Sequence, residues 1–134
     1  MDHLKSAKDF DFWNVKKKSL HFSTNVNIYF QEQEIWWCSL GINIGVEVDG
    51  RHDSFERPVL IFRKFNSEMF WGLPVTAKNK VGKFYYNFIL HKREQTIIMS
   101  QIKALSSRRL IRRLGKLSDK QFLMIKKIFT DLNQ

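Results

Sequence analysis

Cysteine, proline and glycine are scarce in this 134-residue sequence, with one, two and six copies, and no long hydrophobic run is present. The single cysteine, Cys38, excludes a disulfide within the chain and a zinc site made of several thiolates. No apolar run approaches the roughly 20 residues that cross a bilayer, and the polar residues 1–8 do not have the composition of a signal peptide. We therefore expect a cytoplasmic protein that does not enter a membrane.

The motifs of several enzyme classes are also missing. The sequence has no glycine-rich phosphate loop, no HExxH, no GxSxG and no cluster of cysteines and histidines at metal-binding spacing. Its four histidines are scattered, which does not favour catalysis by a pair of histidines. A metal site formed by Glu47, Asp49 and Asp53 is the weaker alternative, because acidic residues in loops more often stabilise turns and ion pairs. We expect neither a metal ion nor another cofactor.

Acidic residues are too few to balance the basic ones. The chain has 23 Lys and Arg against 13 Asp and Glu, which gives a formal net charge of +10. A small protein with such a charge attracts polyanions, either a nucleic acid or an acidic protein segment. The charge alone does not distinguish these partners.

Most hydrophobic segments have the length and composition of β-strands. Residues 34–40 (EIWWCSL) form the first predicted strand, and residues 58–65 and 69–73 form a hairpin around a turn at Asn66 and Ser67. The later predictions are a strand at 84–90, a charged turn at 91–95, short strands at 96–99, 101–105 and 111–115, and a turn or single helical turn at 106–110.

Two segments have helical periodicity. Residues 9–21 follow a candidate cap at Asp9, and Ser118 and Gln121 match a capping box that opens a helix over residues 118–132. The apolar stripe of the second helix is expected to cover one face of the sheet.

Many short strands in mostly local order, followed by a helix, are typical of a small, strongly bent antiparallel barrel. We expect residues 31–134 to form this mainly β domain together with the C-terminal helix. Residues 1–30 would be a short N-terminal extension that is helical in part.

The predicted hairpin brings two polar residues together. Pairing Phe65 with Glu68 would place Arg57 beside Thr76 at the open end of the hairpin. If the substrate is RNA, whose 2′-hydroxyl can attack the adjacent phosphate, Arg57 could stabilise the charge of the phosphorane and Thr76 could donate a hydrogen bond to a non-bridging oxygen. The alternatives are a structural ion pair for Arg57 and a simple strand-end residue for Thr76.

A polar, glycine-rich segment at residues 41–54 precedes Arg57 and is expected to be a mobile loop or extended hairpin over the site. An arginine is too basic to be a good general base, so the candidates for this role are Glu47, His52 and Asp53.

Basic and aromatic residues that could contact RNA follow the hairpin. They occupy the basic turn 77–82, the next strand and the basic run 103–116, which contains no acidic residue. Each is individually more typical of a solvated face or of core packing. The candidates are Lys78, Lys80, Lys83, Tyr85, Tyr86, Lys103 and Arg108.

The order of several segments resembles one family. EIWW, NIGVEVDG at 43–50, RPVLIF at 57–62, LPVT at 73–76, MSQIKALSSRRL at 99–110 and a following Gly-x-Leu precede the closing helix. From about residue 32 to the C-terminus, this succession resembles the MazF/PemK toxins of bacterial toxin–antitoxin systems. The first thirty residues have no counterpart in the compact members of that family.

The resemblance implies the SH3-like barrel shared by MazF, PemK and the gyrase poison CcdB, as a homodimer. It also implies metal-independent cleavage of single-stranded mRNA that leaves a 2′,3′-cyclic phosphate and a 5′-hydroxyl. The family's arginine, threonine and loop glutamate fall on Arg57, Thr76 and Glu47, and Gln101 lies in the motif near the RNA groove. Val48 replaces the glutamine that often follows the glutamate.

The resemblance further implies an acidic cognate antitoxin that competes with RNA for the basic surface. Two alternatives remain: a non-enzymatic poison of DNA gyrase on the same fold, and a basic RNA-binding barrel without toxicity. Retention of both Arg57 and Thr76 disfavours a gyrase poison, which does not need this pair.

Overall fold

The structure is a computed structural model that describes residues 10–21, 28–41 and 56–132. These residues are mainly in β-strands, with one helix before the first strand and one after the last. The elements are, in chain order, α2 (Phe10–His21), β1 (Glu34–Ser39), β2 (Glu56–Lys64), β3 (Met69–Thr76), β4 (Tyr85–Leu90), β5 (Arg93–Ile98), the 3₁₀ turn η1 (Met99–Gln101), β6 (Lys103–Ser106), the 3₁₀ turn η2 (Ser107–Arg109), β7 (Leu110–Lys116) and α3 (Asp119–Leu132).

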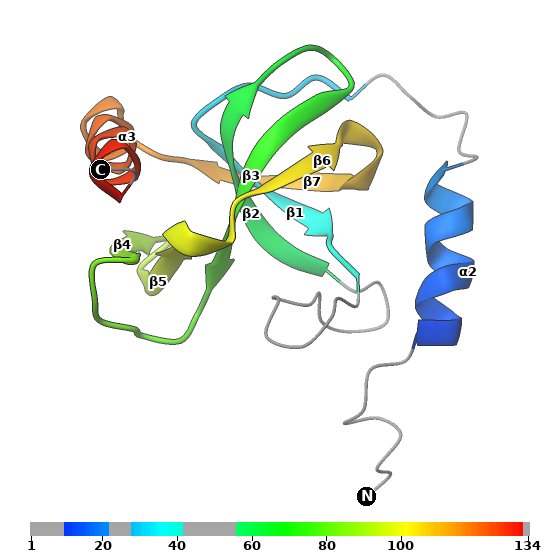
Figure 1. The fold of residues 1–134 in the computed structure, drawn as a ribbon, viewed down its shortest axis with the longest axis horizontal. Helices are drawn as coiled ribbons and strands as arrows, with labels where there is room; N and C mark the ends of the chain where they lie inside the picture. The colour runs from blue at the N-terminus through cyan, green and yellow to red at the C-terminus, as the bar shows by residue number, and fades with distance from the viewer. Residues whose placement is uncertain (1–9, 22–27, 42–55, 133–134) are drawn as a thin grey trace, which may run out of the picture.

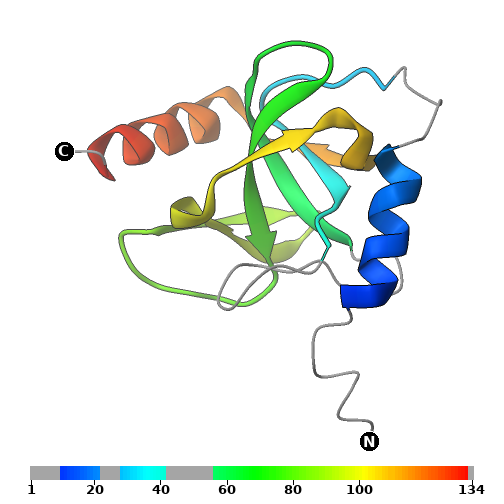
Figure 2. The ribbon, with the colours of Figure 1, turned by 45° about the vertical axis from the view of Figure 1, so that its right-hand side comes forward.

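The strands form one curled antiparallel sheet in the order β4-β5-β3-β2-β1-β7, and β6 pairs with β3 beside this path. Figures 1 and 2 show the sheet wrapped around a core, with α3 and α2 at opposite ends of the molecule. The predicted mainly β barrel with a C-terminal helix and an N-terminal helix is therefore confirmed. Within the described residues, neither helix has the length and apolar character that crossing a membrane would require.

The β2–β3 turn is one residue wider than predicted. Phe65 does not pair with Glu68; instead its N–H donates to the carbonyl of Met69 at 3.1 Å. The reason is the side chain of Asn66, whose Oδ1 accepts hydrogen bonds from the N–H groups of both Glu68 and Met69. This local bond replaces a tight two-residue turn.

A β-bulge at Phe62 offsets the extra residue of the β2–β3 turn. The register changes by one residue between Ile61 and Arg63, after which Val59 pairs with Pro74. Arg57 and Thr76 each lie two residues beyond that pair, so the predicted alignment of these two residues at the open end of the hairpin is reached.

The charged turn predicted at 91–95 is shorter in the structure. Only His91 and Lys92 form the β4–β5 turn, with φ of 51° and 63°, and β5 already begins at Arg93. Two successive positive φ values produce a hairpin turn whose twist matches that of the strands. Glycine or asparagine usually marks such turns, and neither is present, so this tight turn has no clear signal among its residues. β5 also ends one residue earlier than predicted, because Met99 begins η1.

Helix α3 covers one side of the barrel core. Phe122 and Ile125 are buried against a cluster that includes Leu60, Leu73 and Ile97. The predicted capping box is present: the Ser118 N–H donates to Gln121 Oε1 at 2.9 Å, and the Gln121 N–H donates to Ser118 Oγ at 3.1 Å.

Helix α2 packs on the barrel through one aromatic side chain. Trp13 is 4% exposed, whereas Phe10, three residues earlier on the same helix, is 52% exposed. The indole lies directly against Gly41, at the end of the segment that follows β1. A second core cluster, which includes Phe30 and Phe70, fills the barrel beneath β1 and β2.

Candidate active site

Arg57 and Thr76 line the same pocket at the open end of the β2–β3 hairpin. The pocket has a volume of about 430 Å³ and is closed by the start of β2, the end of β3, the β4–β5 hairpin and β7. The lining residues are Trp37, Glu56, Arg57, Pro58, Val75, Thr76, Ala77, Lys78, Leu90, His91, Arg93, Gln95 and Leu114.

The Arg57 side chain is held in a fixed place in this pocket. It is only 8% exposed, and its Nη1 donates to the carbonyl of Val75 at 3.3 Å. This bond ties the guanidinium to β3 immediately beside Thr76. A guanidinium carries five N–H donors and stays protonated in proteins, so Arg57 places a permanent positive charge in a partly desolvated wall.

Thr76 is 6% exposed, and its hydroxyl has a defined role as an acceptor. The N–H of Lys78 donates to Thr76 Oγ1 at 3.2 Å. Because Oγ1 accepts this bond, the hydroxyl proton can be directed toward a negatively charged oxygen in the pocket. The Thr76 side chain is therefore suited to donate to an oxyanion.

One wall of the pocket contains an ion pair. Glu56 accepts from Arg112 Nη1 at 3.0 Å, and the Arg112 guanidinium lies 5.0 Å from the centre of the Trp37 ring. Among the described residues that line the pocket, Glu56 is the only carboxylate. No group of three or more His, Cys, Asp or Glu that could hold a metal ion is present in residues 10–21, 28–41 and 56–132.

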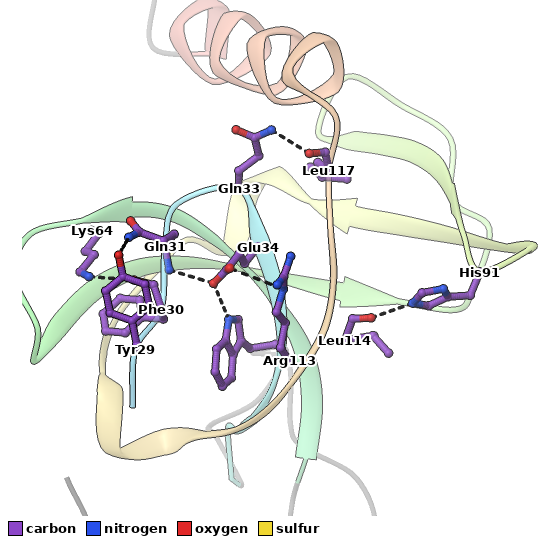
Figure 3. Close-up of polar contacts among 11 residues, drawn as sticks. Tyr29, Phe30, Gln31, Gln33, Glu34, Lys64, His91, Arg113, Leu114 and Leu117 are labelled. Atoms are coloured by element: carbon purple, nitrogen blue, oxygen red, sulfur yellow. Dashed lines mark hydrogen bonds and ion pairs between the residues drawn. The ribbon is translucent and has the colours of Figure 1, made fainter. Parts of the chain in front are cut away.

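His91 is a pocket residue that the sequence interpretation did not select. Its Nε2 lies 2.7 Å from the carbonyl oxygen of Leu114 on β7 (Figure 3). A carbonyl oxygen only accepts, so Nε2 carries the proton in this contact and Nδ1 of the neutral ring is an acceptor. The imidazole belongs to the β4–β5 turn, which was predicted over 91–95 and is limited to His91 and Lys92 in the structure. Glu47, His52 and Asp53, the predicted general-base candidates, lie outside the described residues.

The structure distributes the predicted RNA-contacting residues over several places. Lys78 lines the Arg57 pocket. Lys80 lies 5.7 Å from the centre of the Tyr85 ring, and Tyr86 packs against the core beside Phe88. The remaining candidates are Lys83, which lies over the Phe84 ring, the half-buried Gln101 and Lys103 near η1, and Arg108, which lies beside α2.

Part of the predicted basic run forms surface ion pairs with carboxylates of neighbouring strands. Arg113 Nε lies 3.5 Å from Glu34 Oε2, and Glu34 Oε1 also accepts from the Gln31 N–H and from Trp36 Nε1 (Figure 3). Together with the Glu56–Arg112 pair, this contact stabilises the β1–β7 edge. The two arginines of β7 therefore have internal partners, which lowers the positive charge available at this edge.

The fold and the pocket together define a small curled-barrel protein with a cation-lined polar site at one end of its central hairpin. The family model of PemK-like, MazF-like toxins of type II toxin–antitoxin systems matches residues 31–132. This chain belongs to that family, and the predicted resemblance is confirmed. No curated protein sequence matches the chain.

Solved structures of MazF toxins have the same fold. MazF from Deinococcus radiodurans superposes with a TM-score of 0.63 and 16% identity, over 80% of this chain and 98% of that one. An endoribonuclease in complex with its cognate antitoxin from a mycobacterial species gives 0.58 and 13%, over 78% and 96%. The Mycobacterium tuberculosis toxin MazF-mt6 gives 0.57 and 13%, over 73% and 93%. At these identities the similarity shows the fold.

Proposed function

We propose that this chain is a cytoplasmic toxin that cleaves single-stranded mRNA without a metal ion. In the proposed reaction, the 2′-hydroxyl oxygen bonds to the adjacent phosphorus and the bond from phosphorus to the 5′-oxygen breaks. The products are a 2′,3′-cyclic phosphate and a 5′-hydroxyl. The observation that carries the proposal is the placement of the buried Arg57 and Thr76 in one pocket. A structure with the same fold is that of an endoribonuclease, which agrees with this class of reaction.

The pocket supports stabilisation of the charged phosphorane. Arg57 is fixed by its bond to the Val75 carbonyl, so its guanidinium requires little reorganisation when charge develops. Thr76 would donate its hydroxyl proton to a non-bridging oxygen, and Lys78 would add a second positive charge at the rim. Since Arg112 already engages the pocket carboxylate Glu56, the lining favours stabilisation by cationic side chains.

Two proton transfers complete the reaction. A base must accept the 2′-hydroxyl proton, and an acid must supply a proton to the leaving 5′-oxygen. His91 is the described pocket residue suited to one of these roles, because its Nε2–H is held by Leu114 and its Nδ1 can exchange a proton. Glu47, His52 and Asp53 are the candidates from outside the described residues.

The decisive test uses a long single-stranded RNA in excess EDTA, with fragment ends mapped after incubation. Wild type should produce cyclic-phosphate ends, and Arg57→Ala should cleave at least about tenfold more slowly, a loss of about 1.4 kcal/mol of transition-state stabilisation. Arg63→Ala is the matched control, because Arg63 is an exposed arginine on the same strand outside the pocket. A folded Arg57→Ala variant with full activity would remove Arg57 from the site.

The same assay examines Thr76. Thr76→Ala should also lower the rate at least about tenfold, whereas Thr76→Ser keeps a hydroxyl and should retain most activity. Equal rates for both variants would show that the hydroxyl does not act on the phosphorane. If wild type binds RNA but leaves it intact, the chain is an RNA-binding barrel; if it binds no RNA and inhibits DNA supercoiling, it is a gyrase poison.

We further propose that the chain is a homodimer with RNA along the dimer groove and that an acidic antitoxin competes for this surface. The solved MazE–MazF complex from Deinococcus radiodurans, which has this fold with a TM-score of 0.57, supports an antitoxin partner. Light scattering tests the dimer, because a particle of 16.1 kDa would be a monomer. Retained RNA binding in the presence of a saturating acidic antitoxin would contradict the competition.

A further inference from the structure

A second pocket lies between helix α2 and the connection from β6 to β7. Its volume is about 390 Å³, and none of its described lining residues also lines the Arg57 pocket. Figures 1 and 2 both show α2 beside this connection, at the end of the molecule away from α3. The lining residues are Asn14, Lys17, Lys18, Leu20, His21, Ser106, Arg108 and Arg109.

Positive charge is concentrated in this pocket. Four of the eight lining residues that the structure describes are Lys or Arg, and none of the eight is a carboxylate. In the described part of the chain, no carboxylate forms an ion pair with any of these four residues. This distinguishes the pocket from β7, where Arg112 and Arg113 pair with Glu56 and Glu34. Converging like charges repel unless an anion lies between them, so the pocket is electrostatically suited to an anion.

The arginines of this pocket are held in position by the fold. Arg109 Nη1 donates to the Ser39 carbonyl at 3.1 Å, and its guanidinium lies 5.7 Å from the centre of the Trp13 ring. Arg108 Nη1 donates to the carbonyl of His21 at the end of α2. The pocket is therefore formed by both the helix and the barrel, and its two arginines contact α2 as well as the barrel.

We propose that this pocket binds a backbone phosphate of the same RNA strand whose scissile phosphate occupies the Arg57 pocket; this inference rests on the proposed function. Guanidinium groups match phosphate oxygens, and Asn14 and Ser106 add neutral hydrogen-bonding groups. Among the lining residues that the structure describes, Leu20 is the only one with an aliphatic side chain, whereas a protein segment would be expected to need larger apolar anchors. The observations therefore favour RNA over an acidic peptide.

Two contacts on one strand should strengthen binding of long RNA only. A short RNA fills the Arg57 pocket alone, while a longer strand also reaches the α2 pocket and gains from the second contact through effective concentration. The pocket thus assigns a role to helix α2, which lies outside the residues 31–132 matched by the family model.

The test measures fluorescence anisotropy of labelled 2′-O-methyl RNAs of about 6 and about 20 nucleotides, which lack the attacking hydroxyl. The variant is Lys17→Gln/Lys18→Gln, because both side chains are exposed and their replacement leaves the core intact. The matched control is Lys120→Gln/Lys127→Gln, which removes the same charge from exposed sites on α3. Circular dichroism verifies folding of each.

The α2 variant should bind the longer RNA at least about fivefold more weakly, and its salt slope should fall by up to about 1.4, while binding of the shorter RNA stays unchanged. Equal losses in the α2 and α3 variants, or an equal loss for the shorter RNA, would overturn the proposal. Loss of binding to a polyglutamate peptide, with RNA binding intact, would assign the pocket to an acidic protein segment instead.

Cleavage by wild type is measured in parallel with unmodified RNA. If the α2 variant binds the longer RNA more weakly and wild type does not cleave RNA, the phosphate pocket would be supported and the proposed nuclease activity would be refuted. Cleavage by wild type with no change of affinity in the α2 variant would refute the pocket and keep the nuclease.

Discussion

His91 lines the Arg57 pocket, and one nitrogen of its ring is already engaged in a hydrogen bond. Its Nε2 donates to Leu114, so only Nδ1 can exchange a proton with a substrate. Replacing His91 by Gln preserves a possible N–H donor for Leu114 but removes proton exchange. If the imidazole transfers a proton, His91→Gln should lower kcat at least about tenfold and remove one limb of the pH–rate profile.

Lys92→Gln is the control for this measurement, because it changes the neighbouring residue of the same turn. A His91→Gln enzyme with the wild-type pH profile would leave His91 with a positioning role at most. The assay also distinguishes His91 from the loop candidates. If another residue is the general base, the His91→Gln variant should keep the limb of the pH–rate profile that this base produces.

The buried thiol of Cys38 should make the folded protein less stable at alkaline pH. Burial raises the pKa of its thiol from 9.0 to about 12, although the nearby positive charge of Arg109 acts in the opposite direction. The unfolded chain loses this proton above about pH 9 while the folded chain keeps it, so the thiol lowers the free energy of unfolding by up to about 1.4 kcal/mol per pH unit up to about pH 12.

Urea unfolding at several pH values between about 8 and 11 measures this effect. Near pH 8, Cys38→Ala should be less stable than wild type because it leaves a cavity, but its free energy of unfolding should decline less steeply as the pH rises. Parallel declines for wild type and Cys38→Ala would show that the thiol does not contribute.

At the scale of elements, the joint between α2 and the barrel depends on Gly41. This residue has a φ of 80°, and an added Cβ would lie 2.0 Å from Cε2 of Trp13. Gly41→Ala should therefore expel the indole and release α2 from the barrel, at a cost of about 2 kcal/mol or more. Limited proteolysis should cut within α2 while the barrel stays resistant.

Gly82→Ala is the control, because Gly82 also has a positive φ but its added Cβ would approach Tyr85 no closer than 3.5 Å. Both variants carry backbone strain, and only Gly41→Ala adds the clash. Equal protection of α2 in the two variants would show that Trp13 does not attach the helix.

Several elements could be predicted from sequence because their signals are local. The capping box at Ser118, the strand at 34–40 and the N-terminal helix were all predicted within about two residues of their observed bounds. The bulge at Phe62 and the positive φ values at His91 and Lys92 have no local signal, because tertiary packing imposes them on ordinary residues.

At the scale of the whole molecule, the site was predictable only where one hairpin builds it. Arg57 and Thr76 belong to adjacent strands, so strand pairing alone brought them together. His91 contacts Leu114, and Lys17 and Arg108 line one pocket, although each pair is far apart in the sequence. Such long-range proximity depends on how the sheet curls, which composition and periodicity do not specify.

The two pockets, and the two functions proposed for them, lie on separate parts of the chain. The groups proposed to break the RNA sit on the central hairpin, and the groups proposed to hold a distant phosphate sit where α2 meets the barrel. If both proposals hold, a change at the Trp13–Gly41 contact would alter how long an RNA strand stays bound without moving Arg57 or Thr76. Residence time and chemical rate would then be adjustable independently, so that selection could change which transcripts stay bound while the cleavage chemistry stays constant.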